Sequence, residues 1–323
     1  MGLTVGQALL QLVVQLCQVL LVVAIAPAVT GLIRRVKARL QRRYGPPILQ
    51  PYRDLRRLLG KEVVVADSTS WFFRAAPYAV FAATWVAAAL VPTFKTGLMF
   101  SWSGDLIAIV ALLGLARFIQ AAAAIDTGTS FGGIGVSREV MIASLAEPAM
   151  IMVVFTLSLV AGATQLSTIA ETMLNGHEGL RVSLALALVA LVIVAVAENG
   201  RIPVDNPSTH LELTMVHEAM VLEYSGRHLA MIEWAASLKL MLYVSMIACV
   251  FVPVGLAGDM ASPVRDVVGA VAWVAKMAVG GIALGVAEMS VAKMRVFRVP
   301  NFLGAALMLG LLGVLLLFVS RGM

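Results

Sequence analysis

The chain has 323 residues, of which 60% are hydrophobic and only 13% are charged. A soluble domain is about half apolar and about a quarter charged, so this composition excludes a soluble enzyme and indicates a protein whose solvent is lipid. The formal net charge is +6, but ten of the 24 cations lie between Arg34 and Lys61. Because the positive charge is local and not interleaved with aromatic residues, no binding of nucleic acid is expected.

Eight stretches are apolar enough to cross a bilayer, which takes roughly 20 residues in a helix. They cover roughly residues 3–33, 71–91, 101–124, 136–161, 180–198, 230–254, 264–292 and 300–320. We therefore predict an all-α polytopic membrane protein, a single integral-membrane domain over residues 1–323 with about eight transmembrane helices. Structured cytoplasmic loops are expected at about 34–70, 125–135, 199–229 and 293–299.

The cations of the loops are distributed unevenly between the two sides of the predicted membrane domain. Assigned to alternate loops, 17 of them fall on one side and four on the other. Because positively charged loops stay in the cytoplasm, we expect the large loops there and both termini outside. The first span has no cation before Arg34, so it is expected to be retained and not cleaved as a signal peptide.

The loop from Arg34 to Glu62, here called the platform, is basic and rich in proline. Its arginines suit anionic lipid head groups, which predicts an interfacial anchor. Gly45-Pro46-Pro47 and Gln50-Pro51 prevent one continuous amphipathic helix and impose a bend, which suits a docking surface for a soluble protein. Composition leaves both interpretations open. The candidate docking residues are Arg42, Arg43, Pro46, Gln50, Arg53, Arg56, Arg57 and Lys61.

Several predicted spans contain residues that are unusual in a membrane. A charge at the bilayer centre costs about 2.5 to 3.5 kcal/mol, so such side chains are expected to face the bundle interior. They either line one polar chamber or pin the helices as fixed ion pairs. Pro27, Gly280, Gly281 and Gly285 mark a kink or a close approach between helices. The charged residues in the cytoplasmic half of their spans are Arg117, Glu147, Glu198, Lys239 and Glu288.

The segment from Glu198 to Gly226 concentrates prolines, carboxylates and imidazoles. Pro203 and Asn206-Pro207-Ser208 end one helix and cap the next, which predicts a cytoplasmic helix from His210 to Tyr224. Carboxylates and imidazoles stepped along a helix suit proton transfer, and a solvated helix face is the alternative. The candidates are Glu212 and Glu223 on one face, with His210, His217 and Glu218 as relay residues.

No metal or dinucleotide site is predicted. His217-Glu218 begins a zinc-protease-like HExxH, but Val221 occupies the position of the second histidine. Phe131 to Gly135 does not follow a strand, so its glycines are expected to permit a tight turn into the fourth span. Cys17 and Cys249 cannot supply the four ligands of an iron–sulfur cluster. Any redox cofactor is therefore expected in partner subunits.

Several separated motifs, taken in order, resemble one family. These are Arg34 to Glu62, Asp126 to Glu139, Glu147-Pro148 and Glu198 to Gly226. Over essentially the whole chain they resemble the membrane subunit that respiratory complex I, as its subunit 1, shares with the energy-converting group 4 NiFe hydrogenases. After Asp205 the complex I pattern is a denser acidic run, so the sequence is more similar to the formate hydrogenlyase and hydrogenase-4 branch.

The resemblance implies a non-catalytic coupling subunit of a bacterial or archaeal cytoplasmic (inner) membrane. It would anchor the redox arm of a membrane-bound hydrogenase complex and carry protons from the redox interface into the membrane arm. The implied partners are hydrogenase large and small subunits, an iron–sulfur electron-transfer subunit and an antiporter-like membrane subunit. Those partners would hold the NiFe centre and the iron–sulfur clusters, and this chain no cofactor.

By motif position the resemblance also implies which residues carry protons. The implied path uses Glu147, Glu198, Asp205, Glu212 and Glu223, with Arg138 and Arg201 as basic partners. The intramembrane Lys239, Glu288 and Arg117 complete this candidate set. Two alternatives stay open, namely the quinone-site subunit of a complex I and a stand-alone ion transporter.

Overall fold

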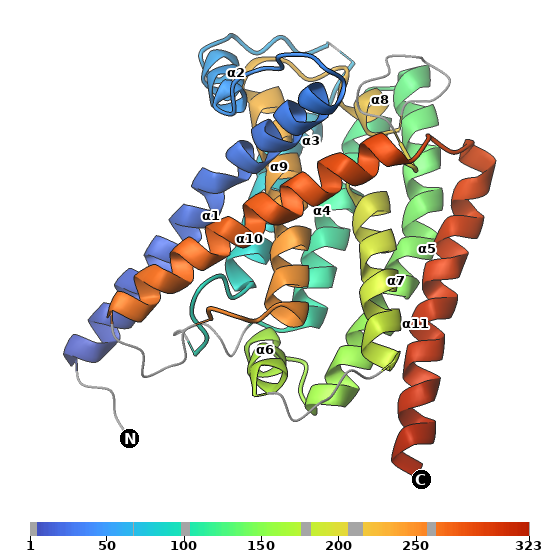
Figure 1. Cartoon of the computed structure of the whole chain (residues 1–323). Coiled ribbons are helices and arrows are strands. Elements are labelled where there is room, and N and C mark those ends of the chain that lie inside the picture. The colour runs from blue at the N-terminus through green and yellow to red at the C-terminus, as the bar shows by residue number, and fades with distance from the viewer. Residues whose placement is uncertain are drawn as a thin grey trace.

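The computed structural model describes residues 5–66, 68–97, 104–175, 182–205, 216–256 and 263–322. In these ranges every regular element is a helix (Figure 1). The elements are α1 (Val5–Leu40), α2 (Gln50–Leu59), α3 (Trp71–Leu90), α4 (Leu106–Asp126), α5 (Ser130–Ala161), α6 (Leu166–Leu174), α7 (Val182–Glu198), α8 (His217–Val221), α9 (Gly226–Phe251), α10 (Pro263–Ser290), the 3-10 turn η3 (Val296–Arg298) and α11 (Val299–Gly322).

The predicted all-α membrane fold is confirmed. Seven of the described helices are long and apolar enough to cross a membrane, and α7, with 17 residues, is apolar but shorter. Each predicted span corresponds to one of these eight helices. Ser70 and Asp105 begin α3 and α4 as N-caps, because each side chain accepts a hydrogen bond from the backbone N–H two residues further on.

The start of α5 differs from the expected turn at Phe131 to Gly135. The helix begins at Ser130, where Thr129 Oγ1 accepts the N–H of Gly132, so these glycines form its first turns. Their missing side chains make room for neighbours. A Cβ on Gly132 would lie 2.6 Å from the Ala124 carbonyl oxygen, and one on Gly135 would lie 3.0 Å from Ala219 Cβ of α8.

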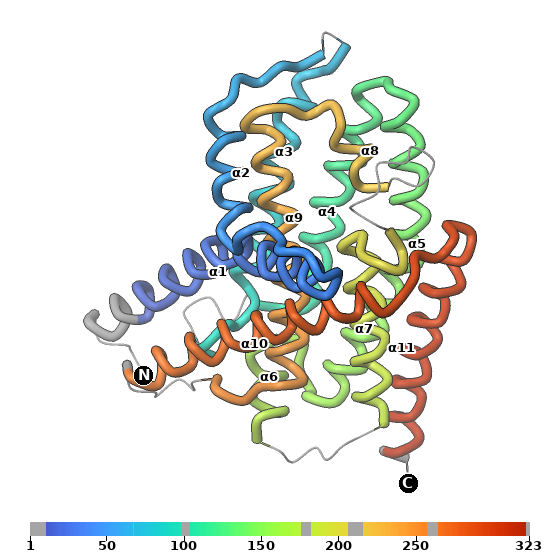
Figure 2. Tube along the Cα trace, turned by 45° about the horizontal axis from the view of Figure 1, so that its top comes forward, coloured from blue at the N-terminus to red at the C-terminus, as the bar shows by residue number. Residues whose placement is uncertain are grey.

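The helices form an upright bundle crossed by an inclined pair. In Figures 1 and 2, α1 and α10 run side by side at an angle to α4, α5, α7, α9 and α11. The platform, with α2, lies with α8 at one end of the bundle, here called the platform end. Helix α1 begins and α11 ends at the opposite end, called the far end. Both terminal helices therefore leave the bundle on the same side.

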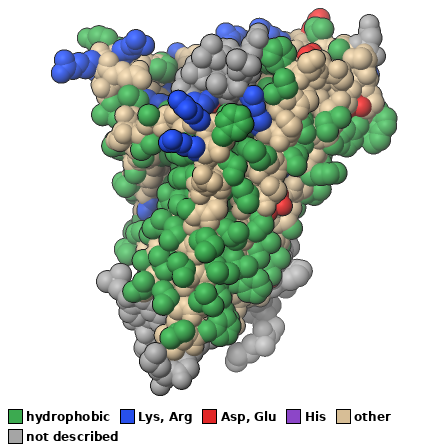
Figure 3. All heavy atoms as spheres, turned by 90° about the vertical axis from the view of Figure 1, so that its right-hand side faces the viewer, with side chains coloured by type: hydrophobic (Ala, Val, Ile, Leu, Met, Phe, Trp, Pro, Cys, Tyr) green, Lys and Arg blue, Asp and Glu red, His purple; other side chains and the backbone are tan. Residues whose placement is uncertain are grey.

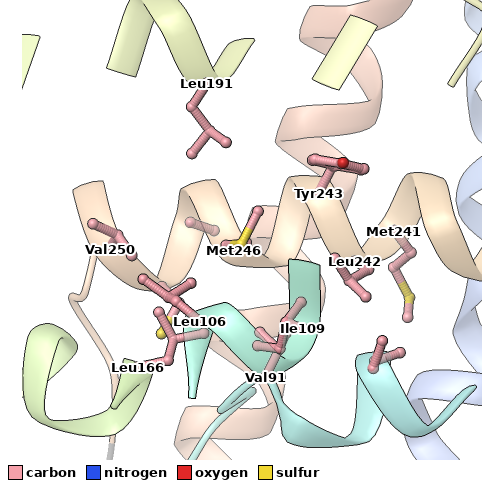
Figure 4. Packing of buried hydrophobic residues seen from close by; sticks show 14 of the residues in the cluster. Val91, Leu106, Ile109, Leu166, Leu191, Met241, Leu242, Tyr243, Met246 and Val250 are labelled. Atoms are coloured by element: carbon pink, nitrogen blue, oxygen red, sulfur yellow. The ribbon is translucent and has the colours of Figure 1, made fainter. Parts of the chain in front are cut away.

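The bundle core is built around α9, which packs on α1, α2, α3, α6, α7 and α10. Its Met241, Leu242 and Met246 are almost fully buried. Figure 4 shows side chains of α4, α6 and α7 meeting those of α9 around Met246. Helix α9 is therefore the central element of the bundle, and most of the other helices pack against it.

Glycines of α10 allow close helix packing, which is one of the two roles predicted for them. Gly281 and Gly285 face Ile33 and Val36 of α1, where a Cβ on Gly285 would lie 3.1 Å from Val36 Cγ1. Gly280 faces α9 on the other side, with Val244 Cγ1 2.5 Å from the place of a Cβ. Small residues thus let α10 contact two helices at once.

Charged and apolar side chains separate along the bundle axis. On the face shown in Figure 3, basic side chains gather toward the platform end, whereas hydrophobic side chains cover the middle and lower surface. Large apolar side chains are exposed on α5 and α11, among them Ile151, Phe155, Leu315 and Phe318. This distribution is that of a helix bundle embedded in lipid.

We expect Gly31→Ala to displace the platform. A Cβ at position 31 of α1 would lie 2.1 Å from the Ile48 carbonyl oxygen, which is backbone and cannot rotate away. Such overpacking costs about 1 to 3 kcal/mol of stability. The thermal midpoint of the purified subunit should fall, and proteolysis should become faster near residue 48. Gly304→Ala is the control, since nothing lies within 4 Å of its added Cβ; equal midpoints for the two variants would contradict the prediction.

Candidate functional site

A cavity of about 400 Å³ lies among the helices toward the platform end. Side chains of α1, α3, α4, α5, α7 and α9 line it, together with residues of the segments 199–205 and 216–218. Many of the lining side chains are charged or polar. The charged ones are Arg34, Lys37, Arg117, Glu139, Glu198, Arg201, Asp205, Glu218, Glu233 and Lys239. The cavity is therefore suited to water and protons.

Five charged residues from four helices form what we call the Arg117 group. The buried guanidinium of Arg117 lies with Nε 3.5 Å from Glu139 Oε1 and with Nη1 3.2 Å from Glu147 Oε1. Its Nη2 contacts Glu198 Oε1. The other oxygen of Glu198 lies 3.0 Å from Lys239 Nζ. Arginine suits this role because its fork presents five donors in fixed directions.

A second set, the Glu288 group, joins α1, α10 and the segment after α7. The fully buried carboxylate of Glu288 lies 2.7 Å from Lys37 Nζ and 3.5 Å from Arg201 Nη1. Burial lowers the pKa of the Arg201 guanidinium, while Glu288 opposes this shift and Arg34 adds to it. Since Lys37 and Arg201 also line the cavity, this group borders the same space as the Arg117 group.

Asp205 is bonded to described residues that follow it in the chain. Its Oδ1 lies 2.9 Å from Lys293 Nζ, and its Oδ2 accepts the backbone N–H of Val216 at 3.3 Å. The carboxylate therefore links Lys293, just after α10, to Val216; residues 206–215 lie outside the described residues. His217, the first residue of α8, has Nδ1 3.4 Å from Gln120 Nε2 of α4.

The two groups differ in their charge balance. In the Arg117 group three carboxylates share two cations, whereas in the Glu288 group one carboxylate has two cations. In surroundings of low dielectric constant an uncompensated charge is costly. One bound proton would balance the Arg117 group. With every member charged, the Arg117 group therefore carries one more negative than positive charge.

Glu147 is the most exposed member of the Arg117 group, with 46% of its side-chain surface accessible. It stands 17 residues after the first residue of α5, which is about 25 Å along the helix. The predicted span began at about residue 136, so the earlier start of α5 at Ser130 places Glu147 deeper along the helix than the sequence predicts. Glu147 thus lies near the middle of α5, bonded to Arg117 inside the bundle and partly open to its outside.

The structure gathers many of the predicted proton-path residues. Glu147 and Glu288 are bonded to residues of the cavity lining. Glu223 is exposed and belongs to neither ion-pair group. Of the predicted helix from His210 to Tyr224 the structure describes only α8, and His210 and Glu212 lie outside the described residues. The predicted residues that line the cavity are Arg117, Glu198, Arg201, Asp205, His217, Glu218 and Lys239.

Sequence reasoning missed several partners in these groups. Lys37 was assigned to the basic platform, but α1 continues through it to Leu40 and directs it to Glu288. Glu139 ends one of the motifs that carry the resemblance, but it was not among the predicted site residues. Tyr243, which stands one turn after Lys239 on α9, lies fully buried beside the Arg117 group. The sequence contained an indication that Lys37 belongs to the first helix, since it stands one helical turn after Arg34.

The platform presents its candidate docking residues to the outside. Arg42, Arg43, Arg53, Arg56, Arg57 and Lys61 are all exposed. The paired prolines lie in a non-helical stretch, and Pro51 stands in the first turn of α2. Tyr44, 87% exposed, lies under the guanidinium of Arg39. Exposed arginine beside exposed tyrosine is typical of protein interfaces.

Among the described residues, no group of three or more His, Cys, Asp or Glu side chains is arranged to hold a metal ion. Both cysteines carry free thiols.

The fold and its buried ion pairs define a multi-pass membrane subunit of the kind found in respiratory complexes, as comparison with known proteins shows. Formate hydrogenlyase subunit 4 of Escherichia coli (strain K12) is 33% identical over 88% of this chain and 92% of its own length. Hydrogenase-4 component C of the same organism is 35% identical over 76% of each chain. NADH-ubiquinone oxidoreductase chain 1 of Triticum aestivum is 29% identical over 61% of this chain and 62% of its own.

The family assignment follows from the sequence as a whole. Residues 12–319 match the NADH dehydrogenase family, and the chain belongs to it. A solved chain in the structure of the membrane-bound sulfane sulfur reductase, an archaeal respiratory membrane complex, has the same fold. It superposes with a TM-score of 0.80 at 19% identity and covers 95% of this chain and 99% of that chain.

Proposed function

We propose that this chain is the non-catalytic coupling subunit of a membrane-bound hydrogenase complex. It anchors the soluble redox arm on the platform and provides a path for protons from the redox interface into the membrane arm. The partners in this proposal are hydrogenase large and small subunits, an iron–sulfur electron-transfer subunit and an antiporter-like membrane subunit. The platform end faces the cytoplasm, which is supported by the excess of cations at that end.

The surplus carboxylate of the Arg117 group carries this proposal. Protons enter the cavity near Asp205 and His217, reach Glu198 and then pass to Glu147. Both of these glutamates contact the guanidinium of Arg117. When one of the three carboxylates takes up a proton, the ion pair between that carboxylate and Arg117 becomes weaker. The positive charge of Arg117 is then shared by the two carboxylates that are still ionised. Arg117 therefore does not carry the proton; it couples the protonation of one carboxylate to the charge of the next.

The partial exposure of Glu147 supports a neighbouring subunit in the membrane arm. A carboxylate facing lipid at mid-membrane is costly, so such groups normally face protein or water. Glu147 opens to the outside of this chain between α4 and α5, beside Gly114 of α4. An antiporter-like subunit packed there would cover the carboxylate and receive its proton.

A hydrogenase assignment is favoured over a quinone site. The two hydrogenase relatives are 33% and 35% identical to this chain, against 29% for the wheat NADH-ubiquinone oxidoreductase chain. The charged lining of the cavity also suits water better than the isoprenoid tail of a quinone. The composition of the gently purified complex tests this point, because nickel with iron–sulfur clusters supports a hydrogenase and flavin with quinone supports complex I.

We expect Glu147→Gln to assemble normally but to impair coupled ion movement. Glutamine keeps the shape and most of the hydrogen bonding but removes the titratable proton. The measurement is ion movement per donor molecule oxidised in proteoliposomes containing the purified complex. Glu171→Gln, at an exposed carboxylate of α6 remote from the network, is the matched control.

A purely structural ion pair predicts a different pattern. Glu147→Gln and Glu147→Ala would then both weaken assembly, because each leaves a buried cation with less compensation. Normal coupling by an assembled Glu147→Gln complex would show that no required proton step uses this residue.

A further inference from the structure

Proline in α1 opens a backbone carbonyl that another helix uses. Pro27 has no N–H, so the carbonyl of Val23 lacks its intrahelical donor. The indole Nε1–H of Trp234, on α9, donates to this oxygen at 3.2 Å. The hydroxyl of Tyr52, on α2 of the platform, donates to the next carbonyl, that of Ala24. One turn of α1 is therefore bonded both to α9 and to the platform.

Proline in α3 is used in the same way. Pro77 leaves the carbonyl of Phe73 without its intrahelical donor, and the hydroxyl of Tyr224 donates to it at 3.3 Å. The rings of Phe73 and Tyr224 stack with centroids 4.0 Å apart and an interplanar angle of 2°. Burial and the Asp126 carboxylate raise the pKa of the Tyr224 hydroxyl, so it stays protonated and remains a donor at neutral pH.

The residue before α9 is bonded to the chain just after the platform. Ser225 Oγ accepts the N–H of Val64 at 2.8 Å and donates to the Val64 carbonyl at 2.7 Å. Gly226, the first residue of α9, has φ +53° and lies so close to the chain that a Cβ would be 2.5 Å from the Glu62 carbonyl oxygen. Three consecutive residues, Tyr224 to Gly226, thus join α3, the platform and α9.

We propose that Trp234 and Tyr224 are positioning residues that use the carbonyls opened by Pro27 and Pro77 to fix α9, and with it Lys239, relative to Glu198. This inference rests on the proposed function, because it concerns the same proton site. Helix α9 carries both Trp234 and Lys239, five residues apart. A small movement of α9 changes the 3.0 Å contact between Lys239 and Glu198, and so changes how many cations the three carboxylates share.

The same bonds give the platform a mechanical connection to this site. A protein docked on the platform acts on Tyr52 and on the Val64 to Ser225 bonds, and both lead to α9. The proline-opened carbonyls of Val23 and Phe73 are suited to this task because each accepts a hydrogen bond from a side chain of another part of the chain, Trp234 in α9 or Tyr224 just before α9. Interhelical bonds of this kind oppose movement of one helix along its neighbour.

The test compares two tryptophans. Trp234→Phe keeps most of the ring but removes the donor to Val23. Trp85→Phe is the matched control, because the Trp85 indole N–H is buried and has no partner in the described part of the chain. In proteoliposomes we expect Trp234→Phe to lower ion movement per donor oxidised about fivefold, the population change that one ordinary hydrogen bond supports. Trp85→Phe should couple like the unaltered complex.

A second variant separates positioning from stability. Pro27→Ala restores an N–H that can pair the Val23 carbonyl within α1. In the Trp234→Phe/Pro27→Ala complex we expect the thermal midpoint to recover, because no buried carbonyl is left unpaired. Coupling should stay low, because α1 and α9 are still not bonded to each other. Recovery of coupling together with stability would overturn the inference, as would normal coupling in Trp234→Phe.

Measuring Glu147→Gln in the same preparation separates the two proposals. If Glu147→Gln uncouples ion movement while Trp234→Phe does not, the positioning inference is wrong and the proposed function stands. If Glu147→Gln couples normally, the proposed proton path fails, and the positioning inference fails with it. Tyr224→Phe, which keeps the stacked ring and removes the hydroxyl, should reproduce the result of Trp234→Phe.

Discussion

Glu198→Gln should prevent stable assembly of this subunit. The carboxylate of Glu198 is almost fully buried and contacts both Arg117 and Lys239. Neutral glutamine makes the numbers of charges in the Arg117 group equal, and Arg117 keeps Glu139 and Glu147, but Lys239 loses the carboxylate that it contacts. Breaking a buried ion pair by removing one partner costs about 3 to 5 kcal/mol, a large part of the stability of an ordinary protein. The measurement is the yield and the thermal midpoint of the subunit in detergent.

A double variant tests whether charge or volume causes that loss. Lys239→Met removes the cation that loses its carboxylate in Glu198→Gln, so the two changes together should cost less than the sum of the single costs. Glu171→Gln, at an exposed carboxylate, should leave the midpoint unchanged. A Glu198→Gln variant as stable as Glu171→Gln would show that the Arg117 group tolerates the loss of its central carboxylate.

Reversing four platform charges should release the soluble arm from membranes. Arg42, Arg43, Arg56 and Arg57 are exposed, and replacing all four by Glu replaces a positive surface with a negative one. Mismatched charges across an interface suppress binding and lower the rate of association. The measurement is the fraction of partner subunits that sediments with membranes, while a tag on this subunit confirms its insertion.

Charge-conserving variants serve as the control for this experiment. The fourfold Arg→Lys variant keeps the charge and loses only the forked geometry, so it should retain most of the arm. An arm that stays bound to the Glu variant, with only the dependence on anionic lipid changed, would favour the lipid-anchor interpretation of the platform.

The spans were predictable because membrane helices follow from length and hydropathy alone. The start of α5 was not, because Gly132, Gly133 and Gly135 disfavour a helix only locally. At Gly132 and Gly135 the structure uses the missing side chains for contacts with the end of α4 and with α8. The contact with α8 joins residues far apart in sequence, and no local pattern contains it.

The charged groups were predictable as a set but not as pairs. Depth along the predicted spans placed Arg117, Glu198 and Lys239 at similar heights, and the structure gathers them at one cavity. Their pairing depends on how α4, α7 and α9 are rotated, which hydropathy does not determine. The roles of Pro27 and Trp234 needed the structure for the same reason. The sequence shows that Pro27 leaves the Val23 carbonyl without its intrahelical donor, but it does not show that Trp234 donates to that carbonyl.

The partial exposure of Glu147 also bears on how such a complex is made in the cell. A newly inserted chain without its neighbour presents a carboxylate to hydrocarbon at mid-helix, which favours either a neutral acid or a distorted bilayer around it. We expect a chain in this state to be degraded faster than one whose Glu147 is covered by a partner subunit. The half-life of this chain, followed by pulse-chase labelling, should therefore depend on synthesis of its membrane partner, and Glu147 would act as a checkpoint for assembly in addition to its proposed proton role.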